Sequence, residues 1–172
     1  VEFLNARAKE DKPWLLSLHF TAPHWPWTGP DDEEESKRID GNLFHHDGGT
    51  MATYAEMVTN MDAAIGRVLD RLKALGQEDN TVVVFTSDNG GAWYVGMEGL
   101  NAPYRGWKAT FYEGGIRTPL FLRWPSRLAA GSTRADLAGH LDLFAVIAGA
   151  AGAALPQDRV MDSEDLLAGP VK

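Results

Sequence analysis

Residues 82–91 read VVVFTSDNGG, a β-branched run that ends in a polar, glycine-rich turn. Residues 82–85 have the length and composition of a strand that is buried on both faces of a parallel sheet. The polar residues follow at the carboxyl end of this strand, which is where open α/β sheets place their ligand sites. The stretch therefore predicts an α/β fold with a functional site at one edge of the sheet.

Two further segments have the character of interior strands. Residues 14–20 read WLLSLHF and follow a proline, and residues 119–124 read PLFLRW and precede one. We expect these runs and residues 82–85 to form a mostly parallel sheet flanked by helices, with a right-handed helical crossover joining the first two strands. The sequence shows no internal repeat and no interdomain linker, so we expect residues 1–172 to form a single domain.

A long amphipathic helix is expected between the first two strands. Thr53 and Glu56 have the spacing of a capping box at its start, and Gly76 occupies the position of a left-handed cap at its end. A second helix is expected at about residues 135–152, and residues 1–10 also have helical spacing. The apolar residues of the long helix recur on one face: Tyr54, Met57, Val58, Met61, Ile65, Val68, Leu69, Leu72 and Leu75.

The composition excludes several classes of protein. There are 16 Lys and Arg against 24 Asp and Glu, which gives a net charge of −8 and argues against nucleic acid as a partner. The longest apolar stretch, residues 143–155, is shorter than the roughly 20 residues of a membrane-spanning helix, so we expect no membrane span. Because there is no cysteine, disulfides, thiolate metal sites and a cysteine nucleophile are absent.

Asp88 and Asn89 are candidate metal ligands. Their side chains offer one charged and one neutral oxygen ligand, which suits a hard cation such as Ca²⁺ or Mg²⁺. The two glycines that follow allow close approach of the backbone. The alternative is an ordinary Asp-Asn-Gly turn whose side chains cap backbone amides.

Lys108 and His24 are candidate anion-binding residues. Lys108 lies in the glycine- and aromatic-rich residues 106–119, and its ammonium could stabilise an oxyanion. His24 lies between two prolines and could donate a hydrogen bond to a leaving-group oxygen or to a bound anion. The alternatives are an exposed surface lysine and a histidine packed between Trp25 and Trp27. In the same region, Glu113 and Arg117 are expected to be structural residues that pair with each other or with neighbouring side chains.

In this order, the segments resemble one known family. They are APHWP at residues 22–26, YAEMV at 54–58, FTSDNGG at 85–91, and then GWK at 106–108 with YEGGIRTP at 112–119. From about residue 10 to residue 155 the chain resembles the formylglycine-dependent sulfatases of the alkaline phosphatase superfamily. The combination of motifs in this order is far more specific than any one of them.

The resemblance implies a fold and a set of roles. It implies part of an alkaline-phosphatase-like three-layer α/β fold, in which Asp88 and Asn89 ligate calcium, Lys108 contacts the sulfate, and His24 hydrogen-bonds the sulfate ester and assists the leaving oxygen. In such enzymes the hydrated aldehyde of formylglycine attacks sulfur. The substrate implied is a sulfated small molecule or glycan, and a periplasmic or extracellular location is favoured.

The chain also departs from the family pattern. Formylglycine forms from a Cys or Ser in the pattern Cys/Ser-x-Pro/Ala-x-Arg, and no serine of the chain lies in that pattern. A strand-end Asp-Asp pair is also missing, since Asp31 and Asp32 run into an acidic loop. We therefore expect residues 1–172 to be the C-terminal part of an incomplete sulfatase catalytic domain, with formylglycine upstream of Val1. We expect weak or absent calcium binding, no turnover by the chain alone, and self-association through exposed sheet edges.

Two other functions stay open at this point. One is a phosphate or phosphonate ester hydrolase of the same superfamily, because the same residues would serve either oxyanion. The other is a non-catalytic module that binds calcium or sulfated glycans through a surface of aromatic residues and histidines. For residues 45–47, His-His-Asp, a solvated loop is favoured, since adjacent histidines lack the spacing of a helical metal pair. The proposed binding surface comprises Trp25, Trp27, Trp93, Tyr94, His45, His46 and Asp47.

Overall fold

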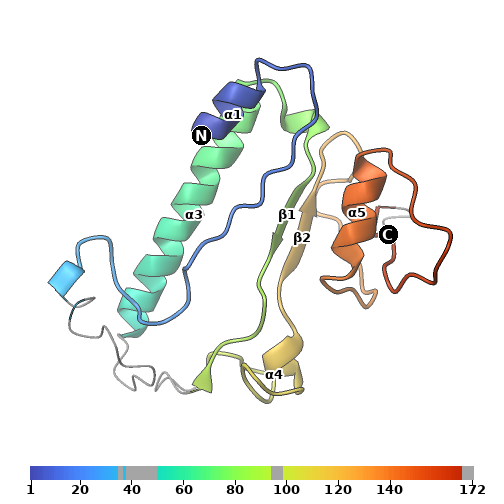
Figure 1. Cartoon of the computed structure of the whole chain (residues 1–172). Coiled ribbons are helices and arrows are strands. Elements are labelled where there is room, and N and C mark those ends of the chain that lie inside the picture. Colours follow the sequence, from blue (N-terminus) through green and yellow to red (C-terminus); the bar gives the residue numbers. More distant parts are fainter. Residues whose placement is uncertain (35–36, 38–49, 94–98, 168–172) are drawn as a thin grey trace.

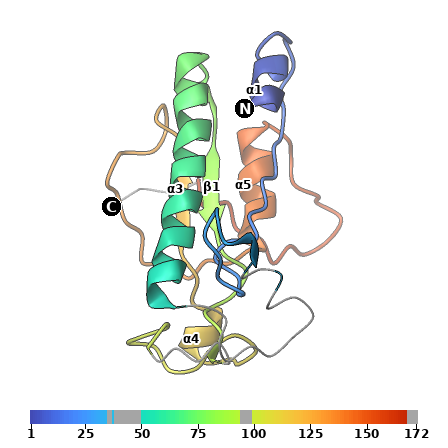
Figure 2. The same ribbon diagram turned by 90° about the vertical axis from the view of Figure 1, so that its left-hand side faces the viewer.

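The computed structural model describes residues 1–34, 37, 50–93 and 99–167. Helix α3 lies on one side of a pair of strands and helix α5 on the other, so the molecule has a helix–sheet–helix arrangement (Figures 1 and 2). The carboxyl end of β1 points toward the end of this arrangement where helix α4 lies (Figure 1). The elements, in chain order, are α1 (Glu2–Arg7), α3 (Met51–Ala74), the 3-10 turn η1 (Glu78–Asn80), β1 (Val83–Thr86), α4 (Glu113–Ile116), β2 (Leu120–Arg123) and α5 (Asp142–Ala150).

Helix α3 confirms the predicted apolar face. All nine residues of that face are buried or half-buried, and most of the positions between them are exposed. Gly76 has a φ of 66°, as expected for a left-handed cap. The predicted start of the helix is wrong by one turn: Thr50 is the N-cap, and its side chain accepts a hydrogen bond from the Thr53 amide at 3.2 Å. The hydroxyl of Thr50, three residues before Thr53, thus caps a free amide of the first helical turn.

The two strands pair antiparallel, which corrects the prediction of a mostly parallel sheet. Val83 lies opposite Arg123 and Thr86 opposite Leu120. The physical reason is the path of the chain between the strands. The described residues between the strands, 87–93 and 99–119, include α4 beyond the carboxyl end of β1, so β2 starts from that end and runs in the opposite direction.

Residues 14–20 were predicted to be an interior strand, and they do not form one in the part of the chain that the structure describes. No backbone hydrogen bond joins them to another described residue, so they have no ladder partner there. Leu15 is 70% exposed, whereas the Trp14 ring packs edge-on against Phe3 with centroids 5.9 Å apart. Strand-like composition therefore gives an extended segment here without a sheet.

The core of the described residues is thin. Residues 83–86 of β1 are half-buried and not fully enclosed, and Phe121 of β2 is 64% exposed. The accessible surface is 12354 Å², whereas a compact monomer of 18.8 kDa exposes about 8,300 Å². Among the described helices, none is long and apolar enough to cross a bilayer. The buried apolar side chains of the described residues are Leu4, Trp27, Leu72, Trp124, Ala145 and Val146.

Helix α5 is shorter than the predicted helix at residues 135–152, because the Asp142 carboxylate closes a turn before it. One oxygen of Asp142 accepts from the Gly139 amide at 2.7 Å, and the other accepts from the Glu164 amide at 2.8 Å. These N–H groups, Glu164 first, hold the pKa of the buried Asp142 carboxyl below its ordinary value of 3.8. Asp142 thus joins the start of α5 to the segment that follows it.

We predict that the chain self-associates, because its accessible surface exceeds that of a compact monomer and large apolar side chains such as Leu15 and Phe121 are exposed on it. Light scattering after gel filtration should give a mass that rises with protein concentration. Leu15→Lys should lower that mass at a given concentration, whereas Ser17→Lys, at an exposed position on the same segment, should change it little. A monomeric mass across a wide concentration range would contradict the prediction.

We also predict that Asp142→Asn lowers the free energy of unfolding at pH 7 by about 1 to 3 kcal/mol, since a neutral amide with one acceptor oxygen replaces a carboxylate that accepts from two N–H donors. Because the folded-state pKa is depressed, the advantage of the wild type is complete at neutral pH and disappears as the pH falls through that lowered pKa. Urea titrations at several pH values measure it. Asp158→Asn, which removes an exposed ion pair with Arg159, is the control and should have no measurable effect.

Candidate anion-binding site

A buried tryptophan fixes the loop that carries His24. Trp27 is 2% exposed, and its indole N–H donates to the Pro23 carbonyl at 2.9 Å. Its ring lies edge-on to Tyr54 in the first turns of α3, with centroids 5.1 Å apart. The His24 amide also donates to the Thr21 carbonyl at 2.9 Å. The loop is therefore attached to α3, while the His24 side chain stays exposed.

The structure brings His24 and Lys108 into contact although 84 residues separate them. Lys108 Nζ lies 3.2 Å from His24 Nε2, and His24 Nδ1 lies 2.6 Å from the Trp25 carbonyl oxygen. A carbonyl only accepts hydrogen bonds, so Nδ1 carries the ring proton and Nε2 accepts from the Lys108 ammonium. An ammonium and an exposed imidazole side by side form a site that is suited to an anion.

Asn101 joins the Lys108 segment to the turn after β1. Its side chain exchanges hydrogen bonds with Gly91, from the Gly91 amide at 2.8 Å and to the Gly91 carbonyl at 2.9 Å, and it also donates to the Gly106 carbonyl at 3.2 Å. The Lys108 amide donates to the same Gly91 carbonyl at 3.0 Å. Sequence reasoning missed Asn101; its one signal was a primary amide within a loop rich in glycine and proline.

A close approach of two glycines holds the turn after β1. The Gly90 amide donates to the Gly115 carbonyl at 3.0 Å, and a Cβ on Gly90 would lie 1.8 Å from the Gly114 carbonyl oxygen. The expected role of the glycines in close backbone approach is thus confirmed. Ala109, directly after Lys108, has a φ of 72°, a left-handed conformation that costs a non-glycine residue about 1 to 2 kcal/mol.

Asp88 and Asn89 lie at the carboxyl end of β1, just before the glycines. Asp88 is exposed, and its carboxylate makes no hydrogen bond or ion pair within the described part of the chain. Asn89 Nδ2 donates to the Gly90 carbonyl at 2.9 Å, which leaves the amide oxygen as an acceptor. These oxygens are of the kind that Ca²⁺ prefers, but they are two of the six to eight that it usually takes.

No other group of acidic, histidine or cysteine side chains adds to that pair among the residues described. There, no cluster of three or more such residues is suited to hold a metal. Residues 45–47 and Tyr94 lie outside the described residues, so that part of the binding surface named above is not seen. For Trp27 the sequence leaves open a place in a binding surface or in the core, and the structure places it in the core. Glu113 and Arg117 form the expected ion pair, at 3.0 Å on the surface of α4.

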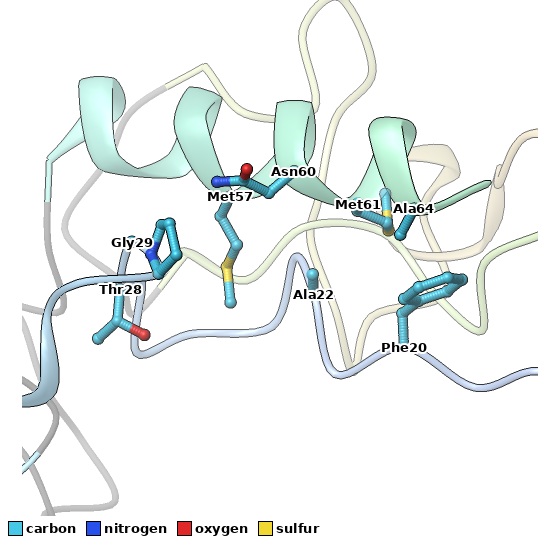
Figure 3. Close-up of a pocket in the computed structure, with 9 residues that line it drawn as sticks. Phe20, Ala22, Thr28, Gly29, Met57, Asn60, Met61 and Ala64 are labelled. Atoms are coloured by element: carbon cyan, nitrogen blue, oxygen red, sulfur yellow. The ribbon is translucent and has the colours of Figure 1, made fainter. Parts of the chain in front are cut away.

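A shallow apolar pocket lies between the His24 loop and α3 (Figure 3). Met57 and Met61 of α3 face Phe20 and Ala22 across it, and none of the four predicted site residues lines it. The pocket thus lies beside the loop that carries His24 and is separate from the contact between His24 and Lys108. Its lining residues are Phe20, Ala22, Thr28, Gly29, Pro30, Met57, Asn60, Met61 and Ala64.

Comparison with known proteins agrees with the order of motifs. The family model described as Sulfatase matches residues 1–153. The chain is 42% identical to mouse (Mus musculus) steryl-sulfatase, over 95% of this chain and 25% of the relative. It is 40% identical to rat (Rattus norvegicus) N-acetylgalactosamine-6-sulfatase, over 97% of this chain and 30% of the relative. The crystal structure of Ps i-CgsB in complex with k-i-k-neocarrahexaose is similar, with a TM-score of 0.77, 30% identity, and coverage of 96% of this chain and 35% of that one.

The fold and the site define an α/β protein with a lysine–histidine pair beside the carboxyl end of a strand. The family match then gives the particular assignment: the chain belongs to the sulfatase family. It spans about a quarter to a third of the length of the relatives and of the solved structure named above.

We predict that Gly90→Ala lowers the free energy of unfolding by about 1 to 3 kcal/mol, because the new methyl group would overlap the Gly114 carbonyl. Gly66→Ala is the matched control. Gly66 lies within α3 with no heavy atom within 4 Å of an added Cβ, so that change should stabilise the chain by about 1 kcal/mol. Chemical denaturation of both variants measures the difference, and equal effects of the two would contradict the prediction.

Proposed function

We propose that the chain is part of a sulfuric ester hydrolase in which His24 and Lys108 bind the sulfate group. The observation that supports this most is the 3.2 Å contact between Lys108 Nζ and His24 Nε2 in a member of the sulfatase family. Both side chains would donate to a sulfate oxygen once His24 Nε2 is protonated. Two positioned donors of this kind stabilise charge that builds on oxygens during ester cleavage.

In this proposal the two residues have different tasks. The Lys108 ammonium is a permanent donor that turns from His24 Nε2 to a sulfate oxygen when the ester enters. His24 keeps its orientation through its Nδ1–H bond to the Trp25 carbonyl, so its Nε2 faces the ester and can pass a proton to the leaving oxygen. Asp88 and Asn89 would supply part of a calcium site. A bound calcium ion there would neutralise negative charge on the sulfate.

The nucleophile of the proposed reaction lies outside residues 1–172. We assign it to a formylglycine made from a Cys or Ser in the pattern Cys/Ser-x-Pro/Ala-x-Arg, which this chain does not contain. The chain would then be the C-terminal part of a sulfatase catalytic domain, and alone it would not turn over. The relatives and the solved structure are about three to four times as long as the matched region, which supports this division.

We propose a sulfated glycan or sulfated small molecule as the substrate. A similar structure holds a neocarrahexaose, and two similar proteins are a steryl-sulfatase and an N-acetylgalactosamine-6-sulfatase, which supports this substrate class. Because these substrates differ in chemistry, the proposal stays at the level of the class. We assign specificity to residues 25–50 and 93–105. A periplasmic or extracellular location is part of the proposal, on family resemblance.

The test begins with the coding sequence upstream of the Val1 codon. The proposal expects a Cys/Ser-x-Pro/Ala-x-Arg pattern there, after a strand that ends in Asp-Asp. The longer product should hydrolyse an aryl sulfate. A Thr or unmodified Ser nucleophile with aryl phosphatase activity would favour the phosphate ester alternative, and a start codon directly before Val1 would leave a binding module.

In that longer product, Lys108→Ala should lower kcat/KM for the aryl sulfate by about 10² to 10³, the usual effect of removing one positioned donor. His24→Ala should lower it by a factor of about 10² to 10⁴. Lys73→Ala, an exposed lysine near the end of α3, is the control and should leave the rate unchanged. Wild-type rates in the Lys108 and His24 variants would contradict the roles proposed for both residues.

A further inference from the structure

A second histidine, His140, contacts the carboxyl end of β1. Its Nε2 lies 2.9 Å from the Ser87 carbonyl oxygen and 3.4 Å from Thr86 Oγ1. The contact joins residues 53 positions apart in the sequence. Because a carbonyl oxygen only accepts, Nε2 must carry a proton and donate it to Ser87.

The Ser87 carbonyl is the first one beyond the ladder between the strands. The register ends with Thr86 opposite Leu120, so β2 offers no ladder partner to residue 87. The Thr86 hydroxyl also turns toward the Ser87 carbonyl, at 3.3 Å, and the Ser87 hydroxyl donates to the Asn89 carbonyl at 3.2 Å. The His140 side chain thus supplies the hydrogen bond that a strand partner would otherwise donate to the carbonyl of Ser87, the residue directly before Asp88.

The backbone at His140 is held by hydrogen bonds of its own. It lies in the turn before α5, where the Asp142 amide donates to the Gly139 carbonyl at 3.1 Å and the Leu143 amide donates to the His140 carbonyl at 3.2 Å. The Asp142 carboxylate closes this turn and ties it to Glu164. An imidazole on a closed turn holds its hydrogen-bond acceptor more rigidly than one on a free loop.

We propose that His140 is a positioning residue that fixes the backbone at Ser87, and with it the direction in which Asp88 and Asn89 leave β1. The task of that pair as metal ligands rests on the proposed function, whereas the fixing of the backbone does not. His140 is exposed and adds little to the core, so its removal should loosen the turn after β1 without unfolding the chain.

Amide hydrogen exchange on the 172-residue chain tests this without metal or substrate. The reporters are the amides of Gly90 and Gly91, which are hydrogen-bonded in the turn. In His140→Ala, exchange at both should rise by about 2- to 10-fold, the effect of losing one hydrogen bond from a local opening. His140→Gln should restore protection, since its amide nitrogen takes the place of Nε2. His19→Ala is the control, because His19 is an exposed histidine with a local hydrogen bond to Ser17.

Two results would overturn the proposal. One is unchanged exchange at Gly90 and Gly91 in His140→Ala. The other is an equal rise throughout α3, which would mean that the whole fold is weakened. A measurement on the wild type is independent of any variant: long-range ¹H–¹⁵N correlations should show a proton on His140 Nε2, and a ring protonated on Nδ1 alone would exclude the bond to Ser87. None of these outcomes depends on sulfatase activity, so failure of this proposal and of the proposed function can be told apart.

Discussion

The contact between Gly90 and the Gly114–Gly115 backbone determines the geometry of the candidate site. A methyl group at Gly90 would overlap the Gly114 carbonyl, so the turn after β1 and helix α4 meet backbone to backbone. Asn101, from the segment between them, hydrogen-bonds to both backbone groups of Gly91. Lys108 takes its position from this assembly, because its amide also binds the Gly91 carbonyl.

His24 reaches the same place by a separate route. Its loop is attached to α3 through Trp27 and Tyr54, and α3 is in turn a rigid element of 24 residues. The contact between His24 and Lys108 therefore joins a helix-anchored loop to a strand-anchored one. Sites built from two independently fixed supports hold their donors in place before a ligand arrives, which lowers the cost of binding.

Patterns that act within a few residues were predictable from the sequence, and those that need a distant partner were not. The nine-residue face of α3 and the left-handed Gly76 follow from local spacing, and the structure confirms both. The pairing of β1 with β2 depends on where residues 87–119 turn, so its direction was wrong. Asn101 and His140 act on backbone groups that no sequence pattern links to them, and both were missed.

The described residues contain more of the proposed anion-binding site than of the proposed calcium site. The anion-binding pair has both of its side chains, each with its support, within this chain. The metal pair has two oxygens, whereas calcium takes about six to eight, so most of a complete shell would have to come from other groups. An ammonium and an imidazole can attract a sulfate ester without a metal, but attraction binds substrate and transition state alike. In the proposed reaction the acceleration therefore comes from the proton that His24 passes to the leaving oxygen and from the charge that both donors stabilise as it builds on the sulfate oxygens, together with a nucleophile outside residues 1–172.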